Sequence, residues 1–169
     1  IENVFTQAFV ALGTTMSTYN AQNIGARQLD RVRKGFRSAD VIGCIYAVAV
    51  GFILFFAGKY FAYLFISDNA ETVIPMVDIY LQCVGMFMIP LYVVNCYRNG
   101  FQGMGYGLLP MLSGVAELIG RGVMAVVAAH EKSYRMACMA SPFAWIVATA
   151  LLFVLYFYVM KDMKKKLCL

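Results

Sequence analysis

The chain of 169 residues is 62% hydrophobic and 14% charged, with a mean hydropathy of +0.70. Soluble domains are roughly 45–50% apolar and about 25% charged, so this composition excludes an ordinary soluble protein. The net charge of +5 does not indicate nucleic-acid binding, because the basic residues stand at the ends of apolar runs rather than on one soluble face. Attraction to anionic lipid headgroups explains them better.

A helix needs about 20 mainly apolar residues to cross a membrane. Five segments have that length: residues 3–26, 41–64, 79–97, 108–129 and 136–160. The first is rich in hydroxyl side chains, among them Thr14, Thr15 and Ser17, which favours packing inside a bundle over contact with lipid. The sequence therefore predicts a single membrane domain over residues 1–169. We expect its fold to be all-α, a polytopic transmembrane helix bundle with five spans.

A basic cluster follows the first segment, and its members are Arg27, Arg31, Arg33, Lys34 and Arg37. Lysine and arginine beside membrane spans are retained in the cytoplasm, so we expect this turn on the cytoplasmic side. Leu29, Val32 and Phe36 recur at helical spacing within it. This recurrence predicts a short interfacial helix over Gln28–Phe36.

The second and third segments carry different polar features. Residues 41–64 contain few polar side chains and are expected to be the most exposed to lipid. Asp40 precedes them, and a negative charge there suits a helix N-terminus. Ser67–Asn69 predict a turn and a helix cap. Pro90 lies in the middle of the third segment and predicts a kink, since proline lacks the N–H that continues a helix.

Four glycines between Arg98 and Pro110 predict a tight connection before the fourth segment. A phosphate-binding loop is excluded, because no strand precedes them and no Lys-Ser/Thr pair follows. The fifth segment ends in a basic stretch that includes Lys164, Lys165 and Lys166. The five cysteines have no paired spacing, so neither a disulfide set nor a metal site is predicted.

The distribution of basic residues predicts the orientation of the chain. With the turn at 27–37 in the cytoplasm, ten Lys and Arg residues fall on that side and three, Lys59, Lys132 and Arg135, on the other. This bias predicts a multi-pass protein of the plasma (inner) membrane with a cytoplasmic C-terminus. The chain opens at Ile1 inside an apolar pattern and without an initiator methionine. We therefore expect it to be the C-terminal part of a longer protein, with at least one more span upstream.

Two stretches resemble the multidrug and toxic compound extrusion (MATE) family. The stretch AQNIGARQLDRVRKGFR, at 21–37, is similar to the (A/G)QN-x-GA signature of that family. The stretch YRNGFQGMGYGLLPMLSGVAELIGR, at 97–121, is similar to its QG-x-G connection and the helix that follows. The resemblance implies twelve helices in two six-helix lobes, with this chain supplying helices eight to twelve, most of the C-terminal lobe.

The same resemblance implies a function, namely export of amphipathic, often cationic compounds (multidrug efflux) by antiport with H⁺ or Na⁺. The implied partners are the lipid bilayer, amphipathic small-molecule substrates and the missing N-terminal lobe. No cofactor beyond the coupling ion is expected.

The candidate site residues come from polarity within the apolar segments. Glu117 and Arg121 share a helix face at i and i+4. Charges inside a membrane usually mark an ion or substrate path, although this pair can also lock its helix against a neighbour. Gln82, Asn95 and Tyr97 are candidates for lining a central cavity or for hydrogen bonds between helices.

Two short motifs are candidates for hinges or gates. Gln22, Asn23 and Gly25 end the first segment, where they can also satisfy freed backbone groups. The second motif belongs to the glycine-rich connection and consists of Gln102, Gly103 and Gly105.

Two other functions remain open from the sequence. A lipid-linked oligosaccharide flippase of the same superfamily requires a larger basic cavity, and Arg98 and Arg121 are the residues that indicate one. A structural membrane subunit would transport nothing. An enzyme is not expected, because the single histidine, His130, has Glu131 beside it but no further catalytic side chains assembled nearby.

Overall fold

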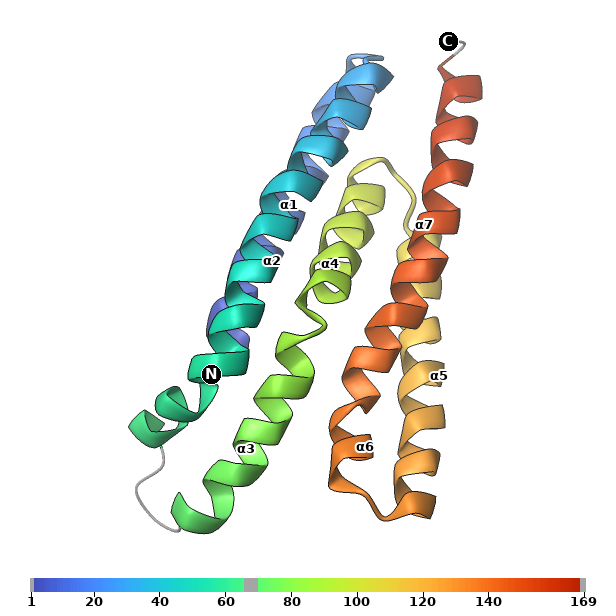
Figure 1. Cartoon of the computed structure of the whole chain (residues 1–169). Coiled ribbons are helices and arrows are strands. Elements are labelled where there is room, and N and C mark those ends of the chain that lie inside the picture. Colours follow the sequence, from blue (N-terminus) through green and yellow to red (C-terminus); the bar gives the residue numbers. More distant parts are fainter. Residues whose placement is uncertain (1, 66–69, 168–169) are drawn as a thin grey trace.

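The computed structural model describes residues 2–65 and 70–167, and within them seven helices and no strand. The helices are α1 (Glu2–Gly25), α2 (Leu29–Phe65), α3 (Ala70–Gly85), α4 (Met88–Gly103), α5 (Leu108–Glu131), α6 (Tyr134–Cys138) and α7 (Ala140–Lys166). They form an elongated bundle (Figure 1). The predicted all-α fold is confirmed. The turn predicted at Ser67–Asn69 lies outside the described residues.

A tight turn joins α1 to α2. Arg27 adopts the left-handed conformation, with φ of 57°, and the amide of Gln28 donates to the carbonyl of Asn23 over 2.8 Å. α2 then continues without a break for 37 residues. The prediction of a separate interfacial helix over 28–36 is therefore wrong. Its residues form the first turns of α2, because no proline separates them from the apolar run.

The length of α2 has a consequence for its two ends. At 37 residues the helix is about 55 Å long, which exceeds the roughly 30 Å hydrocarbon core of a bilayer. Leu29, Val32 and Phe36 are buried against the bundle, whereas Arg31 and Lys34 beside them are exposed. The first turns of α2 therefore combine a packed apolar face with a charged face at one end of the molecule.

The third predicted segment consists of two helices, α3 and α4, which meet at a bend of 57° between Gly85 and Met88. Pro90 lies in the first turn of α4, just beyond the bend. Its nitrogen has no hydrogen for the carbonyl of Met86, so a regular helix cannot run through this point. A Cβ atom on Gly51 of α2 would lie 2.6 Å from the Gly85 carbonyl oxygen. A missing donor and close helix packing together fix the bend.

The connection between α4 and α5 is shorter than predicted. α4 continues to Gly103, which leaves residues 104–107 as the connection. Arg98, predicted to lie in the loop, belongs to the helix.

The fifth predicted segment, 136–160, is interrupted at Met139, where α6 ends and α7 begins. Pro142 lies in the first turn of α7 and lacks the N–H that would bond the carbonyl of Cys138. α7 also continues past the predicted end to Lys166. Its last turns therefore carry the basic stretch on helix rather than on a loose tail.

Three stretches of the described residues are long and apolar enough to cross a membrane: Leu29–Leu64, Leu108–Glu131 and Tyr134–Lys166. The bent pair of α3 and α4 makes a fourth when it counts as one span. α1 is long enough but is not apolar enough to join them, because hydroxyl and amide side chains interrupt its apolar residues. A fifth span through α1 stays a prediction.

Small side chains allow α1 and α4 to approach closely. A Cβ atom on Gly103 would lie 2.0 Å from the carbonyl oxygen of Ser17, and one on Gly13 would lie 2.9 Å from that of Asn95. In the same contact the buried Asn20 donates its side-chain amide to the carbonyl of Gly100 over 3.1 Å. Small residues and interhelical amide bonds of this kind hold membrane helices together.

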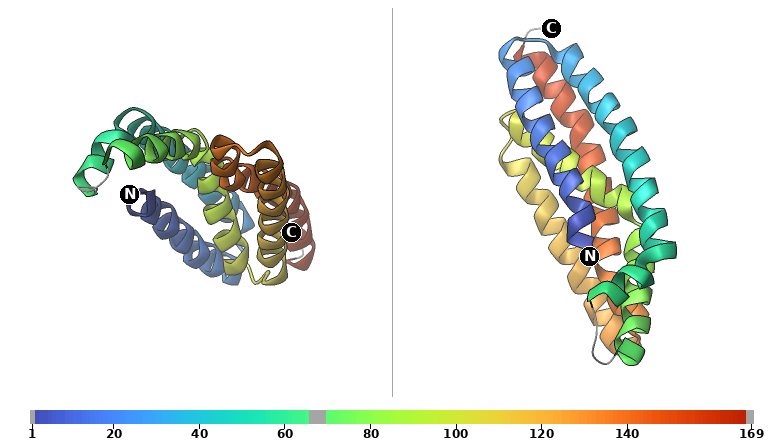
Figure 2. Two further views of the ribbon diagram at one scale, coloured as in Figure 1. Left: turned by 90° about the horizontal axis from the view of Figure 1, so that it is seen from below. Right: turned by 90° about the vertical axis from the view of Figure 1, so that its left-hand side faces the viewer.

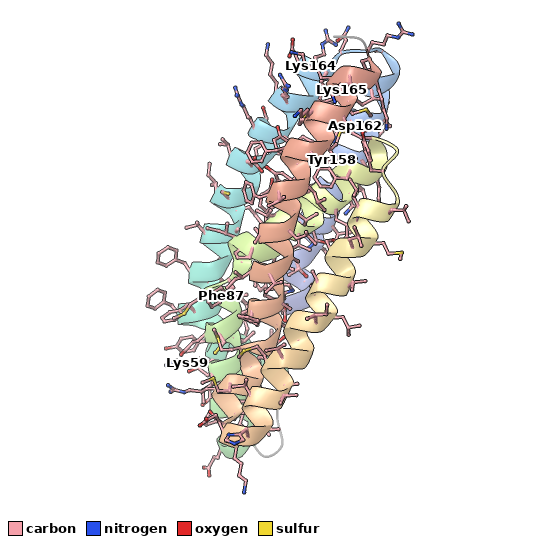
Figure 3. All side chains as sticks on the ribbon, turned by 90° about the vertical axis from the view of Figure 1, so that its right-hand side faces the viewer. Lys59, Phe87, Tyr158, Asp162, Lys164 and Lys165 are labelled. Atoms are coloured by element: carbon pink, nitrogen blue, oxygen red, sulfur yellow. The ribbon has the colours of Figure 1, made fainter. Side chains whose placement is uncertain are left out.

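The two sides of the bundle are formed by different helices. Seen end-on, α1, α4 and α5 follow one another along one side of the bundle, and α2 and α3 lie along the other (Figure 2, left). The turn between α1 and α2 and the end of α7 lie at the same end of the molecule (Figure 1). Lys164 and Lys165 lie at that end, and Lys59 lies toward the opposite end (Figure 3).

Candidate functional site

An ionic network joins α4 to α5. The Arg98 guanidinium donates through Nη2 to Oε2 of Glu117 over 2.8 Å, and Arg121 donates to Oε1 of the same carboxylate over 3.3 Å. Arg98 also donates through Nε to the Ser113 hydroxyl over 3.0 Å, and that hydroxyl donates to the carbonyl of Pro110 over 2.6 Å. Each oxygen of the Glu117 carboxylate therefore has a cationic partner.

Burial decides how strongly these charges interact. The Glu117 side chain is 14% exposed, that of Arg98 30%, and that of Arg121 51%. The predicted pair of Glu117 and Arg121 does form, but the shorter bond comes from Arg98, and from a different helix. Two arginines thus share one carboxylate, so the network has one more formal positive than negative charge and locks α4 to α5.

A groove of about 460 Å³ lies beside this network. Arg98 and Gln102 of α4 form its polar wall, and Met111, Val115 and Leu118 of α5 form its apolar wall. Gly114 also lines the groove, and a Cβ atom there would meet nothing within 4 Å. The groove therefore combines an arginine with an apolar surface, which suits an amphipathic molecule.

A second polar surface belongs to α1 and lies on the side of the bundle that α1, α4 and α5 form. Thr14, Thr15, Thr18 and Gln22 are exposed and line a hollow of about 450 Å³ together with Tyr19. The three threonine hydroxyls donate to carbonyls of their own helix, as Thr15 does to Ala11 over 2.8 Å. This self-satisfaction lets the helix carry threonines in an apolar setting, while the Gln22 amide at its end stays exposed.

The three residues predicted to line a cavity lie apart from both grooves. Gln82 of α3 donates to Asp78 over 2.9 Å. Asn95 of α4 donates to the carbonyl of Leu91 in its own helix over 2.9 Å, and it packs in the contact with α1. Tyr97 is buried and donates to Asp40 over 2.9 Å. Of the three, Tyr97 makes the interhelical hydrogen bond of the alternative prediction, whereas Gln82 and Asn95 donate within their own helices.

The two hinge motifs differ in what their residues do. Asn23 donates to the carbonyl of Tyr19 over 2.8 Å and helps to end α1, but the left-handed residue of the turn is Arg27 rather than Gly25. In the second motif, Gly105 adopts φ of 86°, which favours glycine. Gln102 is exposed in the groove between α4 and α5, and Gly103 faces the backbone of α1.

Asp40 is placed differently from its prediction. It lies inside α2, eleven residues beyond the first residue of that helix, so its charge is not at a helix N-terminus. Its Oδ1 accepts a hydrogen bond from the hydroxyl of Tyr92 over 3.2 Å, and its Oδ2 accepts the bond from Tyr97. The sequence shows Asp40 as a lone carboxylate next to an uncharged run. Its tyrosine partners could not be identified from the sequence, because they lie more than fifty positions away.

The connection between α4 and α5 is attached to the end of α7. The hydroxyl of Tyr106 donates to Oδ2 of Asp162, and Lys166 forms an ion pair with the same oxygen over 2.8 Å. The Lys166 ammonium also lies 4.8 Å from the centre of the Tyr106 ring. Burial, and then the bond to Asp162, raises the pKa of Tyr106, so the hydroxyl stays protonated and donates at neutral pH.

Metal-ligating side chains are dispersed. Among residues 2–65 and 70–167, no three His, Cys, Asp or Glu side chains lie close enough together to hold a metal ion. Cys44, Cys83, Cys96 and Cys138 are free thiols. The polar chemistry described above therefore rests on arginine, carboxylate, hydroxyl and amide groups.

Comparison with known proteins identifies the family. The family model for MatE matches residues 1–127, from α1 into α5. No match was found among curated proteins or among solved structures. The match covers most of the chain and includes both of the stretches that resemble the family. The chain belongs to the MatE family of membrane transporters.

Proposed function

We propose that this chain forms most of one lobe of a secondary active transporter that exports amphipathic or cationic compounds in exchange for H⁺ or Na⁺. We place it in the plasma (inner) membrane with the C-terminus in the cytoplasm. Its family supports transport, and the substrate class, coupling ion and orientation are our proposal. Substrates would bind between this lobe and a second one, and rocking of the lobes would expose them to either side in turn.

The observation that carries the proposal is the polar side formed by α1, α4 and α5. It presents exposed threonines and Gln22 on α1, and Gln102 and Arg98 beside a groove of about 460 Å³. Such groups are costly against hydrocarbon and lie against protein or a water-filled cavity in membrane proteins. A facing lobe with water and substrate between would satisfy them.

The contacts of Glu117 favour a supporting role for this residue. Its two oxygens are held by two arginines, so releasing the carboxylate to bind a substrate cation or a proton would leave both arginines without their partner. Arg98 is the network member that lines the groove. We therefore assign Glu117 to locking α4 against α5 and Arg98 to substrate contact.

The charge of the groove favours one second candidate, a flippase for lipid-linked oligosaccharides. The network carries one more positive than negative charge, and the wall opposite Arg98 is apolar. A phosphate head on an apolar chain matches that combination better than an organic cation does. The two candidates therefore differ in the sign of the charge that they require on the substrate.

The test is transport by the full-length protein. Cells that make it should expel ethidium faster than control cells. When the proton and the sodium gradient are collapsed in separate experiments, only loss of the gradient of the coupling ion should abolish this difference. Vesicles containing the purified protein and a fluorescent polyprenyl-phosphate lipid test the second candidate. Ethidium accumulation that is the same with and without the gradients would refute the exporter, and absence of lipid translocation would refute the flippase.

A further inference from the structure

A carboxylate in the bundle has neutral partners only. Asp40 of α2 accepts hydrogen bonds from Tyr92 (3.2 Å) and Tyr97 (2.9 Å) of α4. No lysine, arginine or histidine nitrogen of the described residues lies within 4.0 Å of it. Glu117, by contrast, has two arginines. Of these two carboxylates, Asp40 is the one without a cationic partner within 4.0 Å.

Packing holds the two tyrosines in place. Tyr92 is fully buried, and its ring lies directly on the backbone of Gly43, where a Cβ atom would come within 2.0 Å of the ring. The ring of Tyr97 lies 4.9 Å from that of Phe36 and 5.6 Å from that of Tyr156, centre to centre. Neither ring can turn away freely, so both hydroxyl oxygens stay beside one carboxyl group while their O–H bonds can rotate.

The surroundings of Asp40 contain few other charges. Arg37, one turn back on α2, is exposed. The titratable groups that interact with Asp40 are Cys44 of α2, Tyr92, Cys96 and Tyr97 of α4, and Tyr156 of α7; Arg33 and Arg37 of α2 interact with Tyr156. Tyr19 is engaged with the carbonyl of Arg31 over 3.3 Å. The two arginines attract anions to this end of the helix and do not pair with Asp40.

The position of Asp40 gives it access from one end of the bundle. It is partly exposed and lies about 16 Å along α2 from the helix start, one turn below Arg37 at the basic end. An ionised carboxyl group without a counter-ion is disfavoured in such a setting, and hydroxyl donors compensate only in part. Binding of one proton removes the charge without requiring any other ion.

We propose that Asp40 is a proton-binding site of this lobe and that its charge state controls how α2 is tied to α4. A proton from the aqueous side at the basic end forms an O–H bond on the carboxylate. The protonated oxygen then becomes a donor, so one tyrosine hydroxyl must turn to accept or lose its bond. α4 is the half-helix beyond the 57° bend, so the change acts at the joint of the broken span.

This inference rests on the proposed transport function for its role in the cycle, but the proton site can be measured without transport. The full-length protein in lipid vesicles is examined by infrared difference spectroscopy in a titration that starts above the ordinary carboxyl pKa of about 4 and runs to alkaline pH. The C=O band of a protonated carboxyl group should be lost on going to the higher pH. Asp40→Asn should remove that band.

Asp30→Asn is the matched control, because the same substitution in the same helix affects a side chain that is 91% exposed. It should leave the band unchanged. Tyr97→Phe removes one donor to the carboxylate, and the midpoint of the band should move to higher pH. Gly43→Ala should move it in the same direction without touching a polar group, because the added methyl group displaces the Tyr92 ring.

Separate outcomes overturn the inference and the function. A spectrum without a carboxyl band over this range, or a band that survives Asp40→Asn, overturns the proton site even where the protein exports ethidium. If Asp40→Asn removes the band but the wild-type protein exports no ethidium, the exporter is refuted and the proton site remains supported. Transport whose proton dependence is the same in Asp40→Asn as in the wild type also overturns the role given to Asp40.

Discussion

The contact between α1 and α4 gives the sharpest prediction of stability. Replacing Gly103 by alanine would place a methyl group 2.0 Å from the carbonyl oxygen and 2.6 Å from the carbonyl carbon of Ser17. Both are backbone atoms of a helix, so the clash cannot be relieved by a side-chain rotation. One of the helices must shift, which also stretches the 3.1 Å bond between Asn20 and Gly100.

The expected loss follows from overpacking. Forcing an extra methyl group into a packed contact costs about 1–3 kcal/mol, and a weakened buried hydrogen bond adds about 1 kcal/mol. The intrinsic preference of helices for alanine over glycine returns up to about 1 kcal/mol. We expect Gly103→Ala to lower the free energy of unfolding by about 1–3 kcal/mol.

The assay is reversible unfolding of the purified protein in mixed micelles, with Gly122→Ala as the matched control. Gly122 lies in α5, and a Cβ atom there would meet nothing within 4 Å. This control should be neutral or slightly stabilising. Equal stability of Gly103→Ala and Gly122→Ala would show that α1 and α4 do not pack as closely as described.

Three further predictions concern the ionic network, the connection and the topology. Glu117→Gln should lower the free energy of unfolding by up to about 3 kcal/mol, because it leaves two arginines without their carboxylate; Glu131→Gln, at an exposed position, should have no measurable effect in the same assay. Tyr106→Phe should lower the free energy of unfolding by about 1–2 kcal/mol, because it removes the hydrogen bond to Asp162. Because the pKa of Tyr106 is raised, this hydrogen bond is present below about pH 10 and is lost as the pH rises through the raised pKa, so wild type and variant should converge in strong alkali. In a cysteine-free background, a membrane-impermeant thiol reagent outside intact cells should label a cysteine at Lys132 and spare one at Gln28, and the reverse would refute the orientation.

The sequence predicted those features that depend on local composition. Uncharged runs of span length determine that the chain is helical and belongs in a membrane, since a backbone surrounded by lipid must satisfy its own hydrogen bonds. The spacing of Glu117 and Arg121 was sufficient to predict their contact, because residues four apart share a face of any helix. The Ala21–Arg37 and Tyr97–Arg121 stretches were sufficient to suggest the family.

Features that depend on neighbouring helices were missed or misplaced. Arg98 was assigned to a loop, because glycines that serve close packing against α1 were interpreted as turn residues. The kink that Pro90 predicted is present between Gly85 and Met88, but the contact with Gly51 that adds to the effect of the proline was not predicted.

Composition and spacing therefore determined an all-α membrane protein, its basic end and the Glu117–Arg121 pair, because these depend on residues close together in the chain. Only the tertiary structure decided that Arg98 completes the network and that Tyr92 and Tyr97 enclose Asp40. These partners come from different helices, and packing between the helices sets which of their faces meet. No periodicity within one helix specifies that choice.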